Sequence, residues 1–150
     1  MTARRQPAPL LDLRFAQRLA TATHQFWYRM TGGLVGGNFF GTKILLLTTT
    51  GRRTGRKHTT PLTYVEDGDD FVVIASNGGN ERHPQWWLNL RADPSAEIQA
   101  MSRNIRVSAD EAEGDDRERI WHAVTRRYPV YAGYERRTSR RIPVVLLHPD

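Results

Sequence analysis

Four basic side chains crowd into one short, glycine-bounded segment. They are Arg52, Arg53, Arg56 and Lys57. Glycines such as Gly51 and Gly55 let backbone N–H groups approach an anion closely, and the arginine fork matches phosphate or carboxylate through two hydrogen bonds. We therefore expect an anion-binding turn, with a solvated hairpin tip as the alternative. The segment lacks the Gly-Lys-Ser/Thr ending of a nucleotide-binding P-loop.

A run of small residues follows a predicted strand further along the chain. It reads Ala75, Ser76, Asn77, Gly78 and Gly79. Such residues would let a planar ligand lie close to the backbone, where amide groups could donate to its carbonyl or ring-nitrogen acceptors. A plain loop is the alternative interpretation.

Two adjacent tryptophans, Trp86 and Trp87, lie on a short predicted helix. Neighbouring residues on a helix point in different directions, so one indole could enter the core while the other walls a pocket. Asn89 lies one turn from Trp86 and could add an amide to the same face. The alternative is that both tryptophans are purely structural.

Tyrosines recur at every third position in the segment that holds Tyr128, Tyr131 and Tyr134. In a 3₁₀-like turn this spacing would eclipse the rings and form an aromatic wall with three hydroxyls. Four arginines follow, and they would suit an anion, a nucleic acid or a solvated surface. These arginines are Arg136, Arg137, Arg140 and Arg141.

The composition excludes several kinds of site. The 150-residue chain has no cysteine, which excludes disulfides, a thiol nucleophile and cysteine-ligated metals. The five histidines show no metal-ligand spacing, so no metal is expected. A formal net charge of +6 points to an anionic partner. Because no apolar run could span a bilayer and no signal peptide is recognisable, we expect a cytoplasmic protein.

The elements that must position these residues are mainly strands. Hydrophobic patterning and turn residues predict six of them, at 44–50, 59–66, 71–75, 96–99, 105–109 and 142–147. Pro61 suggests an edge or bulge in the second strand. Helices are predicted at 85–91 and 117–127. We expect a mainly β fold with flanking helices, whose six antiparallel strands curl into a small barrel.

The first part of the chain, 1–40, is expected to form an N-terminal arm and an amphipathic helix, and 41–150 the barrel domain. Apolar residues at helical spacing run along 13–30, and basic residues lie off that stripe. This helix either packs on the domain core or lies as a basic amphipathic helix on a membrane surface. In the second case the protein would be peripheral at the inner face of the cell membrane.

Taken in order, these motifs resemble the deazaflavin-dependent nitroreductase family of actinobacteria. The resemblance rests on LLLTTTGRRTGR at 45–56, TTPL at 59–62, ASNGG at 75–79, HPQWWLNLRADP at 83–94 and the tyrosine segment at 128–134. It implies a split β-barrel that binds reduced coenzyme F420, a deazaflavin with a phosphate and a polyglutamate tail. A flat ring on an anionic chain accounts for a basic turn and aromatic walls in one protein.

The resemblance also implies roles for individual residues. Those expected to hold the phosphate and glutamates are Arg52, Arg53, Thr54, Arg56 and Lys57, with His58 where the family often carries arginine or lysine. Those expected around the ring are Pro61, Leu62, Ala75, Ser76, Asn77, Trp86, Trp87 and Asn89. Those expected to line the substrate side are Tyr128, Tyr131 and Tyr134.

The implied activity is hydride transfer from the reduced deazaflavin to an electron-poor quinone, enone or nitroaromatic. Tyr131, Tyr134, Ser76 or water would deliver the accompanying proton, and water relayed by a tyrosine is favoured. The alternatives are a flavin-mononucleotide oxidoreductase on the same barrel, a non-catalytic F420 carrier and a nucleic-acid module. The partner is a small-molecule substrate, and the protein is expected to be a monomer or a homodimer.

Overall fold

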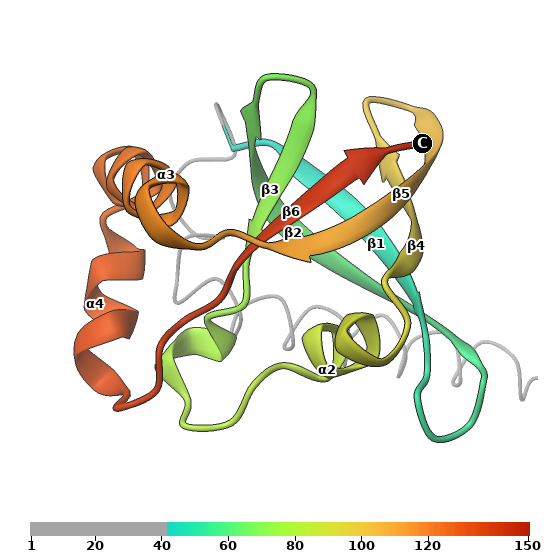
Figure 1. The fold of residues 1–150 in the computed structure, drawn as a ribbon, viewed down its shortest axis with the longest axis horizontal. Helices are drawn as coiled ribbons and strands as arrows, with labels where there is room; N and C mark the ends of the chain where they lie inside the picture. The colour runs from blue at the N-terminus through green and yellow to red at the C-terminus, as the bar shows by residue number, and fades with distance from the viewer. Residues whose placement is uncertain (1–41) are drawn as a thin grey trace, which may run out of the picture. The chain divides into compact units, whose positions relative to one another are not determined.

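A computed structural model describes residues 42–150, so the predicted arm and helix within 1–40 lie outside the described residues. Six antiparallel strands close into a barrel in the order β1-β2-β3-β6-β5-β4 (Figure 1), which confirms the predicted architecture. The strands are β1 (Ile44–Thr50), β2 (Lys57–Asp67), β3 (Asp70–Ile74), β4 (Ser95–Ala100), β5 (Arg103–Glu111) and β6 (Val144–Pro149).

The helices lie in two of the connections between strands. A 3₁₀ turn, η2 (Asn77–Gly79), and the helix α2 (Gln85–Ala92) join β3 to β4. The helices α3 (Gly114–Arg127) and α4 (Val130–Arg137) join β5 to β6. The β1–β2 turn, η2 and α2 all lie along one end of the barrel, at the lower edge of Figure 1.

Period-two alternation fills the barrel interior, because successive strand residues point to opposite faces. On β4, for example, Ala96, Ile98 and Ala100 are buried while the residues between them are exposed. Leu47 on β1 is fully buried and lies opposite Ile98. The interior is thus a packed aliphatic core.

Strands β3 and β6 are buried on both faces, which explains their unbroken apolar runs. One face contributes residues such as Val73 and Val145 to the barrel interior, where they are paired and fully buried. The other face packs beneath α3 and α4. That second cluster consists of Val72, Ile74, Ala112, Ile120, Val124, Tyr134, Ile142 and Val144. The two helices therefore pack on the outer face of β3 and β6.

Five of the six strands have bounds that differ from the sequence prediction, and the starts of β2 and β6 differ by two residues for visible reasons. Strand β2 begins at Lys57 instead of residue 59, because its first residues pair with the end of β1. Strand β6 begins at Val144 instead of residue 142, and Pro143 just before it accepts the Ala75 amide at 3.0 Å. The section of β2 that holds Pro61 pairs with β1 only, so the proline lies where one side of the strand is unpaired.

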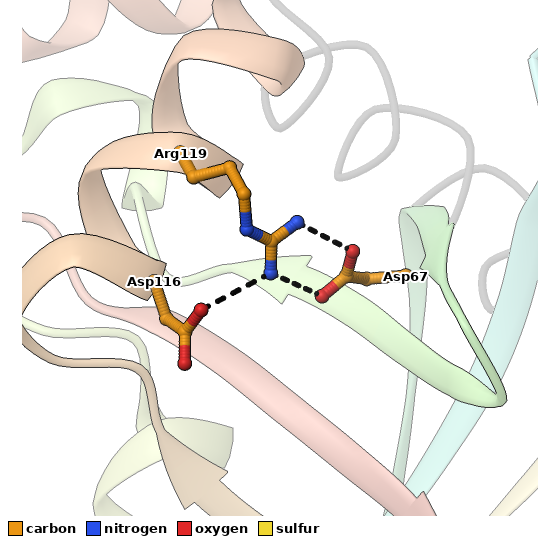
Figure 2. Close-up of polar contacts among 3 residues, drawn as sticks. All are labelled: Asp67, Asp116 and Arg119. Carbon is orange, nitrogen blue, oxygen red and sulfur yellow. Dashed lines mark hydrogen bonds and ion pairs between the residues drawn. The ribbon is translucent and has the colours of Figure 1, made fainter.

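A charged contact fixes α3 against the β2–β3 hairpin. Both terminal nitrogens of Arg119 donate to the Asp67 carboxylate, at 2.8 and 2.9 Å, and one of them also reaches Asp116 at 3.3 Å (Figure 2). The Arg119 hydrogen bonds hold the pKa of Asp67 below its ordinary value. This two-pronged geometry orients the helix, although exposed ion pairs add little stability.

Candidate functional site

The basic turn between β1 and β2 is tightly closed by its own backbone. The amide of Gly51 donates to the Arg56 carbonyl at 2.7 Å, and the amide of Gly55 donates to the Gly51 carbonyl at 2.8 Å. A Cβ built at Gly51 would lie 2.9 Å from both His58 Nε2 and Thr54 Oγ1. Gly51 therefore lies close against two side chains of the turn, and the charged side chains of the turn are exposed.

The cations of this turn do not all behave alike. Arg53 and Arg56 are exposed, and Lys57 is exposed with its ammonium donating to Thr50 Oγ1 at 3.0 Å. Thr54 Oγ1 accepts the Arg56 amide at 3.2 Å, and His58 is exposed beside the turn. These positions present positive charge to solvent.

Arg52, in contrast, is tied to α2. Its guanidinium donates to Gln85 Oε1 at 3.0 Å and to Asn89 Oδ1 at 3.1 Å, and its backbone amide donates to the same Asn89 oxygen at 3.2 Å. Asn89 is buried, and its Nδ2 donates to the buried Thr49 hydroxyl at 3.3 Å. The Asn89 amide thus joins the barrel interior, the basic turn and α2.

Replacing Asn89 with alanine is expected to destabilise the protein by about 2–3 kcal/mol, because it removes the partner of the buried Thr49 hydroxyl and of the part-buried Arg52 amide. Chemical denaturation followed by circular dichroism measures this loss. Gln85→Ala is the matched control, since it removes only the exposed contact to Arg52. Equal losses for the two variants would contradict the buried-junction interpretation.

Helix α2 buries both indoles, with Trp86 and Trp87 each only 5% exposed. If one indole entered the core and the other lined an open pocket, their exposed fractions would differ. The two fractions are equal. Their burial favours the alternative that both tryptophans have a structural role, at least for part of each ring. Together with Asn89, they fix α2 at the barrel end.

The small-residue segment forms a tight, mostly buried corner. Ala75 is fully buried and its amide donates to the Pro143 carbonyl at 3.0 Å, so that N–H is already engaged. Ser76 is 7% exposed, and Asn77 has a φ of 46°. Gly79 has a φ of +80°, and a Cβ there would lie 2.8 Å from the Tyr134 carbonyl oxygen. The corner therefore packs directly on the backbone of α4.

The tyrosine row exists, but an α-helix builds it. The predicted 3₁₀-like turn is wrong, because Val130–Arg137 is α-helical and a single i→i+3 bond, from the Tyr131 amide to the Tyr128 carbonyl, precedes it. The Tyr131 ring meets the Tyr128 ring at 6.3 Å and the Tyr134 ring at 5.9 Å, both edge to face. A spacing of three residues suits both kinds of helix, so the spacing alone could not distinguish them.

The hydroxyls of this row are in unusual surroundings. Within residues 42–150, the buried hydroxyls of Tyr128 and Tyr134 have no hydrogen-bond partner. Burial raises the pKa of Tyr131 and of Tyr134 above the ordinary value, and a hydrogen bond with Thr63 only partly opposes this for Tyr131. The hydroxyls of Tyr131 and Tyr134 therefore stay protonated at neutral pH, as uncharged donors.

Pro61 and Leu62 face opposite ways along β2. Leu62 is buried opposite Leu45 in the barrel interior, while Pro61 is half-buried opposite the exposed Leu46. Thr63, which contacts Tyr131, lies on the same face as Pro61 because strand side chains alternate. The structure thus brings Pro61 toward the tyrosine side and separates Leu62 from it.

Sequence reasoning missed the residue that connects these parts. Arg140 belongs to the arginine cluster left without a role, yet its guanidinium donates to the carbonyls of Ala75, Ser76 and Asn80. Next to it, the Glu81 carboxylate accepts the amide and the hydroxyl of Ser139 at 2.9 and 2.8 Å. No local signal distinguishes Arg140 from its neighbouring arginines.

Comparisons with known proteins identify the family of this chain. The family model described as F420H(2)-dependent quinone reductase matches residues 20–149, beginning before the first motif noted in the sequence. An F420H(2)-dependent quinone reductase of Mycobacterium tuberculosis is 41% identical over 128 residues, which cover 83% of this chain and 86% of that protein.

Solved structures support both the family and the fold. One described as an F420-H2 dependent reductase (FDR-A) is 38% identical with a TM-score of 0.64, covering 70% of this chain and 93% of its own. One described as a domain-swapped dimer is 32% identical with a TM-score of 0.66, covering 89% and 98%. A Listeria innocua structure named for pyridoxamine 5′-phosphate oxidase shares the split-barrel fold alone, at 16% identity and a TM-score of 0.50 over 71% and 83% of the two chains.

The family match spans most of the chain, and it confirms the resemblance drawn from the motifs. This chain belongs to the F420H(2)-dependent quinone reductase family.

Proposed function

We propose that this protein reduces a quinone with F420H2 at the end of the barrel where the basic turn and the Ala75–Gly79 corner lie, beside the tyrosine row of α4. The observation that carries the proposal is the arrangement itself. Exposed cations lie on a turn that is hydrogen-bonded to α2, and the tight backbone corner that precedes α2 in the chain packs on the helix carrying Tyr131 and Tyr134. An anionic tail, a flat ring and a carbonyl acceptor need these three environments in that order.

The residues present fit the cofactor. Exposed guanidinium and ammonium groups on the basic turn match phosphate and carboxylate groups, and the buried hydroxyls of Tyr128 and Tyr134, which find no partner in the described part of the chain, suit a polar ligand. We assign the tail to Arg53, Thr54, Arg56 and Lys57, with His58 at its margin. Arg52 and Asn89 hold the turn in place, because their polar groups already bond to each other.

The ring is assigned to the Ala75–Gly79 corner and the outer face of β2. The amides of Ser76 and Asn77 are the candidate donors, since the Ala75 amide is used by Pro143. Pro61 offers an apolar surface on the face that carries Thr63 and Tyr131. Trp86, Trp87 and Leu62 support this surface from within the protein.

Bound F420H2 supplies a hydride, and the quinone takes up that hydride and one proton to become the hydroquinone. The protein's own contribution is to hold the acceptor in reach of the donor and to lead the proton to the acceptor oxygen. Tyr131 suits the second task because its raised pKa keeps its hydroxyl protonated. It would pass its proton to that oxygen as it takes one from water, so that the hydroxyl ends the step protonated.

Replacing Tyr131 with phenylalanine is expected to lower kcat for quinone reduction about tenfold, below the usual effect of a direct general acid because water can substitute. Steady-state kinetics with menadione measures the change, while the Kd for F420 stays the same. Tyr64→Phe is the matched control, since Tyr64 is buried inside the barrel against Phe71. An unchanged kcat in Tyr131→Phe would remove this tyrosine from the proton path.

The test of the function is stopped-flow oxidation of F420H2 by the full chain, with menadione, an enone and a nitroaromatic as acceptors. Rapid oxidation by menadione supports the proposal. Tight F420 binding without turnover on any acceptor would instead indicate a carrier. Tight binding of flavin mononucleotide with no binding of F420 would reverse the choice of cofactor.

The remaining partners are proposed from sequence and relatives. A relative described as a domain-swapped dimer supports a homodimer for this chain, which light scattering would test. No helix within residues 42–150 is long and apolar enough to cross a membrane. The basic amphipathic pattern at 13–30 supports contact with an acidic membrane surface. Co-sedimentation with anionic liposomes, compared with a chain beginning at Gly32, tests that contact.

A further inference from the structure

Arg140 is saturated by neutral acceptors. Its Nε donates to the Asn80 carbonyl at 2.8 Å, and its Nη2 donates to the carbonyls of Ser76 at 2.8 Å and Ala75 at 3.2 Å. Its Nη1 reaches the Ala75 carbonyl and His83 Nδ1, both at 3.2 Å. A guanidinium has five N–H donors, and these contacts give each of them a partner. Arg140 therefore has no donor left for an anionic ligand.

The contact with His83 defines the state of that imidazole. A guanidinium can only donate, so His83 Nδ1 accepts and its proton lies on Nε2. Burial lowers the pKa of His83, and the charges of Arg140 and Arg91 lower it further, against an opposing effect of Glu111. The imidazole is thus a neutral member of the same network.

The network closes on both sides of the Ala75–Gly79 corner. The Glu81 carboxylate accepts hydrogen bonds from the amide and hydroxyl of Ser139, the residue before Arg140. These bonds fix the position of the backbone from which the Arg140 side chain extends. On the opposite side, Gly79 packs on the Tyr134 backbone. The corner is therefore held at its carbonyls by Arg140 and at its last residue by α4.

We propose that Arg140 is a positioning residue, which holds the carbonyls of the Ala75–Gly79 corner so that the corner's backbone is preset for the flat ring of the cofactor. The inference rests on the proposed function, which places the ring beside this corner. Arg140 acts through Ala75, Ser76 and Asn80 and does not itself touch the cofactor. A lysine has three donors and no planar fork, so it cannot reproduce this pattern.

The test compares Arg140→Lys and Arg140→Gln with Arg136→Gln, a matched control on the exposed end of α4. In the cofactor-free protein, amide hydrogen exchange at residues 76–79 is expected to rise at least about tenfold in both Arg140 variants, and not in the control. The His83 NMR titration is expected to move toward the ordinary pKa in Arg140→Gln only. Both readouts are taken below the melting temperature of each variant.

With cofactor, kcat is expected to fall about 30-fold while the Kd for F420 changes less than about threefold, because a misplaced ring slows reaction although the tail still binds. Should Arg140→Gln fail to fold, Arg140→Lys carries the test. Normal exchange and normal kcat in Arg140→Lys would overturn the proposal. If wild-type amides at 76–79 do not shift when F420 is added, the placement of the ring fails, and increased exchange in the Arg140 variants would still show that Arg140 holds the corner.

Discussion

Reversing the charge at Arg53 is expected to raise the Kd for F420 about 100-fold. The side chain is exposed on the β1–β2 turn, so its change leaves the packed parts of the fold untouched. A hydrogen bond to a charged group contributes enough to change binding by one to two orders of magnitude, and a glutamate adds repulsion toward phosphate and carboxylates. Equilibrium titration with F420 measures the effect.

Two controls separate tail recognition from general electrostatics. Arg103→Glu makes the same charge change on the exposed start of β5, at the β4–β5 hairpin, and is expected to leave the Kd almost unchanged. A deazaflavin lacking the phosphate and glutamates should bind wild type and Arg53→Glu alike. The defect should also shrink in high salt, because screening weakens exposed charge interactions. An equal defect with the tail-less compound would contradict the assignment of Arg53 to the tail.

The strand framework was predictable because burial imposes a pattern on the sequence. Alternation at 105–109 and the apolar run at 71–74 reflect strands covered on one face and on both faces, respectively. The apolar run at 44–47 marked a strand, although Leu46 within it is exposed. Turn residues such as Gly68 marked where strands reverse. The order β1-β2-β3-β6-β5-β4 needed more than local patterns, since β6 pairs with strands far from it in the chain.

The roles of individual arginines were not predictable, because they depend on distant backbone. Arg52 and Arg53 are neighbouring exposed residues, yet the guanidinium of Arg52 bonds to α2. Arg117 is only 5% exposed and donates to the Ile142 carbonyl at 2.7 Å. Arg140 holds carbonyls more than sixty positions away. Net charge counts these side chains equally, whereas the fold uses some as internal hydrogen-bond donors.

The final expectation concerns the contact between the Ala75–Gly79 corner and α4. Replacing Gly79 with alanine is expected to destabilise the protein by about 3 kcal/mol. A side chain at a φ of +80° is strained, and its Cβ would meet the Tyr134 carbonyl oxygen at 2.8 Å and Arg137 Cβ at 3.1 Å. Because the nearest atom belongs to a helix backbone, relief requires α4 to move away. Denaturant unfolding measures the loss of stability.

Gly68→Ala isolates the conformational part of this cost. Gly68 has a φ of +61° but no atom within 4 Å of a built Cβ, so its replacement is expected to cost only about 1 kcal/mol. The difference between the two variants therefore reports the packing of the corner on α4, and similar losses would contradict that close packing. Movement of α4 would also displace Tyr131 and Tyr134 from the corner. Gly79→Ala should accordingly lower kcat for menadione at temperatures where it is folded, whereas Gly68→Ala should not.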